Sequence, residues 1–244
     1  MADLSTLHRS QSGVAMTEFA FVLPLLLLLG LAGIETANYA IAHLRISQIA
    51  MATADNAARV RDSIDEYDIN ELFIGAKLVG QSIDFADHGR IILSSVEPRT
   101  VAPTMTNGKP NQWIRWQRCF GMKQAASSFG APRTKGGTII TNGSEADSDA
   151  TKSSDQAKSL PEANGTPTPT GIGPANNQIG ASPGTALMFV EVVYDYQPLV
   201  PNSILKDRTI RYTSAFNVRQ RSDQVMKTGG IAAGQRSTCN RYYS

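Results

Sequence analysis

Hydrophobic and polar residues are distributed very unevenly along this chain, and its most apolar stretch lies near the N-terminus. Between Phe19 and Ile34 there is no charged residue, and a single carboxylate, Glu18, lies directly before this run. A helix of about 21 residues from Val14 to Ile34 is about 31 Å long, which matches the roughly 30 Å hydrocarbon core of a bilayer. The pattern predicts a membrane-crossing helix with Glu18 just inside one boundary and Glu35 at the other.

This helix is expected to continue beyond the membrane. Apolar residues recur at helical spacing after Ile34, and the segment from Glu35 to Ala58 contains neither Pro nor Gly. We therefore predict one continuous helix from about Val14 to about Ile64, half in lipid and half projecting from it, which makes residues 14–66 the transmembrane and projecting segment.

Several positions of the apolar segment are candidates for packing against other helices. Pro24 removes one backbone hydrogen bond and should kink the helix. The small residues Gly30 and Gly33 allow a neighbouring helix to approach closely. Together with Phe19, these positions form the predicted helix-packing set.

The carboxylate at position 18 is a functional hypothesis, because a charge costs about 2.5 kcal/mol or more at the centre of a membrane helix and less near an interface. Type IV pilin-like proteins begin in the same way, with a glycine, four residues, a glutamate and an aromatic residue. The equivalent positions here are Gly13, Glu18 and Phe19. The pattern predicts a leader, residues 1–13, that a prepilin peptidase removes by cutting between Gly13 and Val14. The new α-amino group of Val14, with a reference pKa of about 7.7–8.0, would then pair with Glu18 of a neighbouring subunit.

Two other interpretations of the N-terminus stay open. A secretory signal peptide has a basic start and a short apolar core that ends at a small-residue cleavage site, conceivable near Leu31-Ala32-Gly33. Arg9 is the clear base ahead of the core, and Glu18 interrupts a region that a signal peptide keeps free of acids. The other alternative is an uncleaved single-pass anchor in which Glu18 merely reaches the interface.

The remainder of the chain predicts a small α+β domain. A short second helix is expected at 70–80. Two late segments alternate apolar and charged residues in the period of a strand, and they would pair antiparallel with complementary outer charges such as Glu191 and Arg211. The four expected strands are 90–96, 113–118, 187–196 and 209–219. The predicted fold class is therefore α+β: a long transmembrane helix followed by a pilin-like head, residues 67–244, with an antiparallel sheet.

The segment 130–184 differs in composition from the rest of the head. It is rich in Ser, Thr, Gly, Pro, Asn and Asp, and its centre reads Gly165-Thr166-Pro167-Thr168-Pro169-Thr170-Gly171. Such a composition buries too little apolar surface to offset the entropy of ordering. We expect a flexible insertion, with a glycosylation or adhesion surface as the alternative.

Charge and cysteine content exclude several classes of function. The formal net charge is +2, and the scattered basic residues argue against nucleic-acid binding. Cys119 and Cys239 are too few for a zinc site, and no cofactor or metal site is expected. If the head lies outside the cytoplasm, a Cys119–Cys239 disulfide is the natural interpretation, with two free thiols as the alternative. The sequence has no hydrolase, metalloprotease or nucleotide-binding motif, so catalysis is not expected.

Two separated segments together indicate a family. The run from Glu18 to Leu26 (EFAFVLPLL) with Gly33-Ile34-Glu35 resembles the start of the TadE-like family, the pseudopilins of tight-adherence (Flp) pilus systems. The segment 190–201 (VEVVYDYQPLVP) resembles a second feature of that family, a strand that runs into a Pro-Leu-x-Pro turn. Ser94-Ser95-Val96 and Trp116-Gln117-Arg118-Cys119 are also similar to TadE-like segments.

The resemblance implies a bacterial inner-membrane protein with a periplasmic head. Its implied partners are other pilins or pseudopilins, the pilus assembly platform and the prepilin peptidase. In one respect the chain departs from the family pattern, because prepilin leaders commonly end in a basic residue before the glycine, whereas Ser12 precedes Gly13 here. The leading hypothesis is a non-catalytic pilus subunit or assembly factor, and the alternative is an uncleaved, membrane-anchored periplasmic binding or adhesion module.

Overall fold

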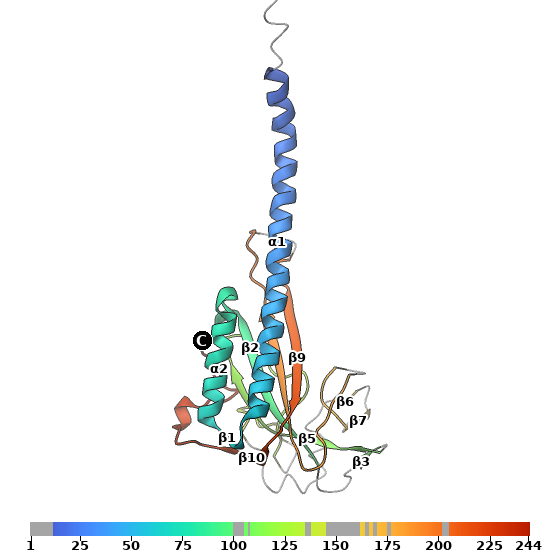
Figure 1. Ribbon diagram of the computed structural model, residues 1–244, viewed down its shortest axis with the longest axis vertical. Helices are drawn as coiled ribbons and strands as arrows, with labels where there is room; N and C mark the ends of the chain where they lie inside the picture. The colour runs from blue at the N-terminus through green and yellow to red at the C-terminus, as the bar shows by residue number, and fades with distance from the viewer. Residues whose placement is uncertain are drawn as a thin grey trace, which may run out of the picture.

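A long N-terminal helix, α1 (Ser12–Arg59), projects from an α+β head and shares its C-terminal half with that head (Figure 1). The computed structural model describes residues 12–99, 105–106, 108–134, 138–144, 162–163, 166–167, 170–174, 177–201 and 205–244. The α+β fold class and the apolar N-terminal helix expected from the sequence are confirmed. The predicted leader lies, apart from its last two residues, outside the described part of the chain.

Helix α1 is 48 residues long and contains Pro24. Figure 1 shows it as one nearly straight rod, without the kink expected from the proline. The helix ends at Arg59, about five residues before the predicted end near Ile64. Two local features stop it: Asp62 has a left-handed backbone with φ of 57°, and β1 (Asp62–Asp65) pairs in parallel with β10 (Arg221–Lys227).

The second helix, α2 (Glu66–Gly80), is confirmed but starts earlier than residue 70. Asp65 accepts a hydrogen bond from the backbone of Asp68, and the Asp68 side chain accepts one in return from the Asp65 backbone. This reciprocal cap satisfies two amides at the helix start and fixes the boundary between β1 and α2. Two short helical turns, η2 (Gln81–Ile83) and α3 (Phe85–His88), connect α2 to the sheet.

The main sheet has four antiparallel strands in the order β5-β2-β8-β9. Each corresponds to a predicted strand: β2 (Gly89–Pro98), β5 (Gln112–Phe120), β8 (Leu187–Asp195) and β9 (Thr209–Asn217). Strands β8 and β9 pair antiparallel as expected, with Val190 opposite Ser214. Tyr212, two positions after the buried Ile210 on β9, is exposed, and β9 is an edge strand of the described sheet.

The inner half of α1 covers one face of this sheet, and α2 packs beside it (Figure 1). Small side chains line the buried stripe of α1, so the helix can lie close to the strands. On the sheet side, β8 contributes alternate residues to the same core. The buried α1 residues of this core are Ala42, Ile46, Ile49, Ala50, Ala54, Ala57 and Ala58, and those of β8 are Met188, Val190, Val192 and Tyr194.

A second, smaller core lies on the other side of the sheet and corrects the expectation for the insertion. Ile172 and Ala181, both inside 130–184, are buried with Val96, Ile114 and Phe189. These described parts of the insertion therefore pack against the sheet, despite its polar composition. Residues 135–137, 145–161, 164–165, 168–169 and 175–176 of the insertion lie outside the described residues.

Short strand pairs and one helical turn complete the described chain. They are β3 (Met105–Thr106) with β4 (Lys109–Pro110), β6 (Glu162–Ala163) with β7 (Thr166–Pro167), and η5 (Ala233–Gln235).

Candidate functional site: the stem and its junction with the head

The N-terminal part of α1, residues 13–34, is called the stem here, and every residue in it is exposed. Its most apolar 18-residue window has a mean hydropathy of 2.2 and has no residue buried against the rest of the protein. Within the described residues, α1 is the one helix long and apolar enough to cross a membrane. A helix that is apolar on all sides yet touches nothing in its own chain is suited to lipid or to other helices.

Glu18 lies on this stem and is exposed, and it is the sole ionisable side chain of residues 13–34. Its carboxylate makes no hydrogen bond or ion pair with the part of the chain that the structure describes. The hydroxyl of Thr17, by contrast, donates to the carbonyl of Val14 at 2.8 Å. A stem hydroxyl is thus satisfied inside the helix, whereas the Glu18 carboxylate has no partner in the part of the chain that the structure describes.

The remaining predicted stem positions also face away from the head. Gly13 and Val14 form the exposed start of the helix, and Phe19 and Pro24 are exposed. A side chain built at Gly30 or Gly33 would meet nothing within 4 Å. The small size of these two residues is therefore not required by packing within this chain.

Glu35 directly follows the stem and, at 4% exposure, is the first buried residue after it on α1. Its carboxylate holds the turn after β8. Oε1 accepts a hydrogen bond from the hydroxyl of Tyr196 at 2.9 Å, and Oε2 accepts from the backbone amides of Leu199 at 3.1 Å and Val200 at 3.0 Å. Glu35 was expected only at a membrane boundary, and its contacts with a segment more than 160 positions away were not foreseen.

One helical turn further into the head, Asn38 extends this network. Its side-chain amide donates to the Tyr196 hydroxyl at 2.8 Å and to the carbonyl of Gln197 at 3.4 Å. The ring of Tyr39 packs edge-on against Tyr196 with centroids 5.0 Å apart. Burial and then the hydrogen bond to Glu35 raise the pKa of Tyr196 to about 12, so the phenol stays protonated and keeps donating.

The two cysteines form a disulfide, Cys119–Cys239, as the sequence suggested for a head outside the cytoplasm. It ties the C-terminal segment to β5, and two backbone bonds reinforce it: Cys119 donates to Ser237 at 2.8 Å and Cys239 donates to Asn142 at 2.9 Å. The bond lies on the far side of the sheet from α1 and has a structural role.

Buried charged residues of the head were not identified from the sequence. Arg118 Nε donates to both carboxylate oxygens of Glu66 at 3.0 and 2.9 Å. Arg90 donates to backbone carbonyls of Gly121, Cys239 and Arg241 and so holds the C-terminal segment. An Asp or Glu at a helix start is common on surfaces, so the sequence carried no sign that Glu66 is buried.

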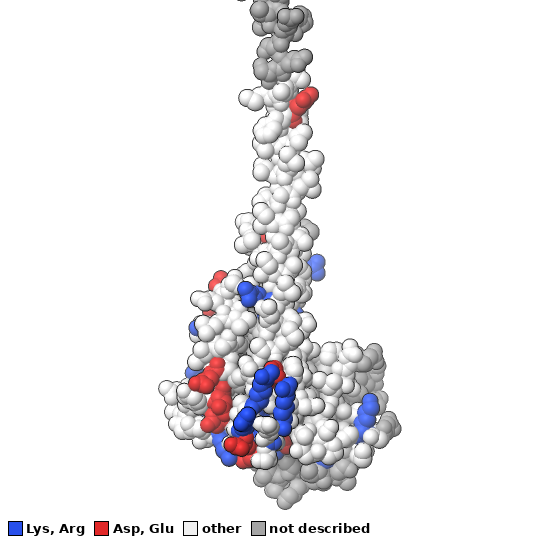
Figure 2. All heavy atoms as spheres, in the orientation of Figure 1, with Lys and Arg blue, Asp and Glu red and all other residues white. Residues whose placement is uncertain are grey.

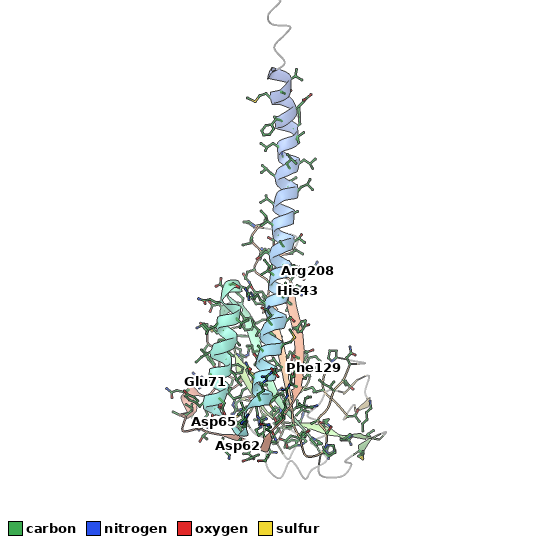
Figure 3. The ribbon with its side chains drawn as sticks, viewed as in Figure 1. His43, Asp62, Asp65, Glu71, Phe129 and Arg208 are labelled. Carbon is green, nitrogen blue, oxygen red and sulfur yellow. A yellow bond between two sulfur atoms is a disulfide. The ribbon has the colours of Figure 1, made fainter. Side chains whose placement is uncertain are left out.

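Among its described residues, the head shows no arrangement of side chains typical of a catalytic or metal site. No group of three or more His, Cys, Asp or Glu side chains there is placed to hold a metal ion. Figure 2 shows an almost uncharged stem, whereas acidic and basic side chains gather at the end of the head away from it. Figure 3 places Asp62, Asp65 and Glu71 toward that end, whereas His43, a residue of α1, lies toward the stem end of the head.

These features define an α+β head carried on a single apolar helix, with a carboxylate on the free part of the helix. A family model described as TadE-like protein matches residues 13–59, which is almost the whole of α1. The TadE-like resemblance expected from the sequence is thereby confirmed for this segment, and it points to a role associated with tight-adherence (Tad) pili. The match ends before β8, so the resemblance at 190–201 stays an expectation.

Two further comparisons found no similar protein. No curated protein and no solved structure matches the chain. The TadE-like family is associated with pili rather than with catalysis.

Proposed function

We propose that this protein is a non-catalytic, pseudopilin-like subunit or assembly factor of a tight-adherence pilus, anchored in the bacterial inner membrane with its head in the periplasm. The observation that carries the proposal is the stem: a fully exposed apolar helix with one unpartnered carboxylate, within a TadE-like segment. The Cys119–Cys239 disulfide supports an oxidising location for the head, since such bonds are rare in the cytosol.

The stem is proposed to assemble with the stems of other pilins or pseudopilins. A prepilin peptidase would cut between Gly13 and Val14, and the new ammonium group would pair with Glu18 of a neighbouring subunit. Removal of one partner of such a buried pair costs about 3–5 kcal/mol, so the pair would set the stagger between subunits. Gly30 and Gly33 leave open space beside the stem into which a neighbouring helix fits.

The first experiment is mass spectrometry of the mature N-terminus, on protein purified from its own membranes. A chain that begins at Val14 and keeps the apolar helix supports the pilin pathway. An intact Met1 contradicts cleavage and favours an uncleaved binding or adhesion module. A start near Ile34 would remove the stem and refute the proposed assembly.

The second experiment tests Glu18. Glu18→Gln should insert into the membrane normally but co-purify less with pilin partners and the assembly platform, because an amide cannot replace the charge. Thr17→Ala is the matched control, since Thr17 is adjacent, exposed and bonded only to its own helix in the described structure. Equal recovery of partners with both variants would contradict the pairing.

A further inference from the structure

The turn that follows β8, residues 197–201, lies at the stem end of the head. Figure 1 shows the described part of the connection between β8 and β9 beside α1, extending further toward the stem than the other described parts of the head. The hydrogen bonds give its direction: Gln197 is held by Asn38, and Leu199 and Val200 are held by Glu35, which is nearer to the stem. The turn therefore runs toward the stem as it leaves the strand.

Glu35 holds the turn beside the last apolar residues of the stem. Long side chains on a helix lean toward its N-terminus, so the Glu35 carboxylate lies over the turn of α1 that precedes its own Cα. That turn contains Leu31 and Ile34, which are 46% and 56% exposed. The backbone of Leu199 is thus held beside the boundary of the segment expected to lie in lipid.

The last four residues of the turn have no free backbone amide to present to an apolar medium. Its sequence is Pro198-Leu199-Val200-Pro201, and the two prolines have no N–H group. The other two amides both donate to Glu35. An irregular segment normally avoids lipid because its backbone N–H and C=O groups are unsatisfied, and in these four residues the N–H groups are all satisfied or absent.

The side chains of the turn fit an interface between water and lipid. Leu199 is 61% exposed and no charged residue lies between Gln197 and Pro201. On the returning segment Lys206 and Arg208 are exposed, with Asp207 between them. Figure 3 places Arg208 at the stem end of the head, near His43 of α1, where a basic side chain can meet anionic headgroups.

We propose that residues 197–201 form a second membrane contact, in which Leu199 enters the lipid interface and Glu35 positions the turn. The partner is the surface of a bilayer that contains anionic phospholipid. This contact rests on the proposed anchoring of α1 in the membrane. It would make the head sit on the bilayer surface at a fixed orientation instead of being held by the helix alone.

The test uses the full-length protein in vesicles of phosphatidylcholine and phosphatidylglycerol, with some of the lipid carrying a doxyl quencher. The chain has no free cysteine in its described residues, so single substitutions accept one thiol-reactive fluorophore. The probe is placed in Leu199→Cys, in Leu26→Cys on the stem, and in Ile74→Cys on α2. Ile74 is the matched control, because it is aliphatic and 60% exposed on the head but away from the turn.

Quenching at position 199 at least about twofold stronger than at position 74 is the expected result, with strong quenching at 26. Quenching at 26 with equal values at 199 and 74 would overturn the contact while the anchoring stands. Absence of quenching at all three positions would mean that the anchoring itself fails. Shielding at 199 that depends on protein concentration and not on lipid would identify a second protein copy as the partner and also overturn the contact.

The role of Glu35 is tested in the Leu199→Cys background. Glu35→Ala should lower quenching at 199 to the value at 74 and leave the probe at 26 unaffected, because only the turn loses its fixed place. Glu35→Gln keeps the size of the side chain and one acceptor oxygen, and should lower quenching less. If the probe at position 199 is quenched as strongly in both Glu35 variants as in Leu199→Cys alone, Glu35 is not the positioning residue.

Discussion

The buried pair between Glu66 and Arg118 gives the sharpest stability prediction. Glu66 begins α2 and Arg118 lies on β5, so the pair joins the helix layer to the sheet. They are 1% and 4% exposed. We predict that Glu66→Ala destabilises the head far more than the loss of any surface ion pair.

The size of the effect follows from what remains after the substitution. Arg118 Nη1 would still donate to the carbonyls of Gln117 at 2.7 Å and Gly143 at 2.8 Å. Nε and Nη2, however, would lose the carboxylate that they share. An uncompensated buried charge costs about 3–5 kcal/mol, and the two remaining carbonyls should hold the loss near the lower end, about 3 kcal/mol. Replacing both residues together, as Glu66→Met with Arg118→Met, should cost less than Glu66→Ala alone.

The assay is denaturant unfolding of the full-length protein in detergent, followed by tryptophan fluorescence. Trp113 and Trp116 are both buried on β5, next to the pair in sequence, and report loss of the head directly. Lys227→Met is the control, because the Lys227–Asp223 pair is exposed and such pairs are worth only about 0.2–1 kcal/mol. A loss below about 1 kcal/mol for Glu66→Ala would refute a dry, buried pair.

Three further predictions concern the disulfide and two titrating groups. Cys119→Ser should lower the free energy of unfolding by about 4–5 kcal/mol on the chain-entropy model, since the bond closes a 120-residue separation; equal denaturation midpoints with and without reductant would contradict this. Burial acts to raise the pKa of Asp195, but hydrogen bonds from Lys123 and Thr209 outweigh it and lower the pKa below its usual value. The stabilisation from this carboxylate is therefore present above the pKa of an unfolded aspartate, about 3.9, and is lost as pH falls through the lower folded value. Asp195→Asn should match the parent in urea melts at the acid end and be weaker at neutral pH; a constant difference across pH would disprove the linkage. The pKa of Tyr196 at about 12 lies above its ordinary value of 10.0, so stability is retained below pH 10 and lost as pH rises toward 12; Tyr196→Phe should reduce that alkaline loss in melts, and an unchanged slope would argue against it.

The sequence predicted most of the fold because the main elements carry strong local patterns. Alternation in 187–196 and 209–219 was sufficient to place β8 and β9 and to pair them correctly. The parallel pair β1–β10 was missed, since parallel pairing joins distant segments and β1 is a four-residue strand without alternation. The boundary of α1 was also missed, because it depends on a left-handed Asp62 that no periodicity reveals.

The site residues of the stem, Gly13 to Gly33, were predicted from the uncharged apolar run and the pilin-like spacing around Glu18, and their roles stay predictions. The structure leaves these residues exposed. The function of Glu35 could not be identified in this way, because its partners are the hydroxyl and amides of the turn at 196–200. One sequence feature was informative in retrospect: Glu35 lies in the segment that the TadE-like model matches, and the turn lies in 190–201, where the resemblance stays an expectation.

The structure gives no flexible linker between stem and head, and this determines how the two move together. From Glu35 to Arg59 the helix contains no Gly or Pro, and its second half forms part of the core of the head. The tilt of the stem therefore sets the tilt of the head, and a force along the stem acts on the core directly. The turn held by Glu35 adds a second connection close to the point where the helix enters the head. Two connections a few residues apart on one helix resist rotation of the head about the stem, so a subunit fixed among other helices would present the same face of its head each time.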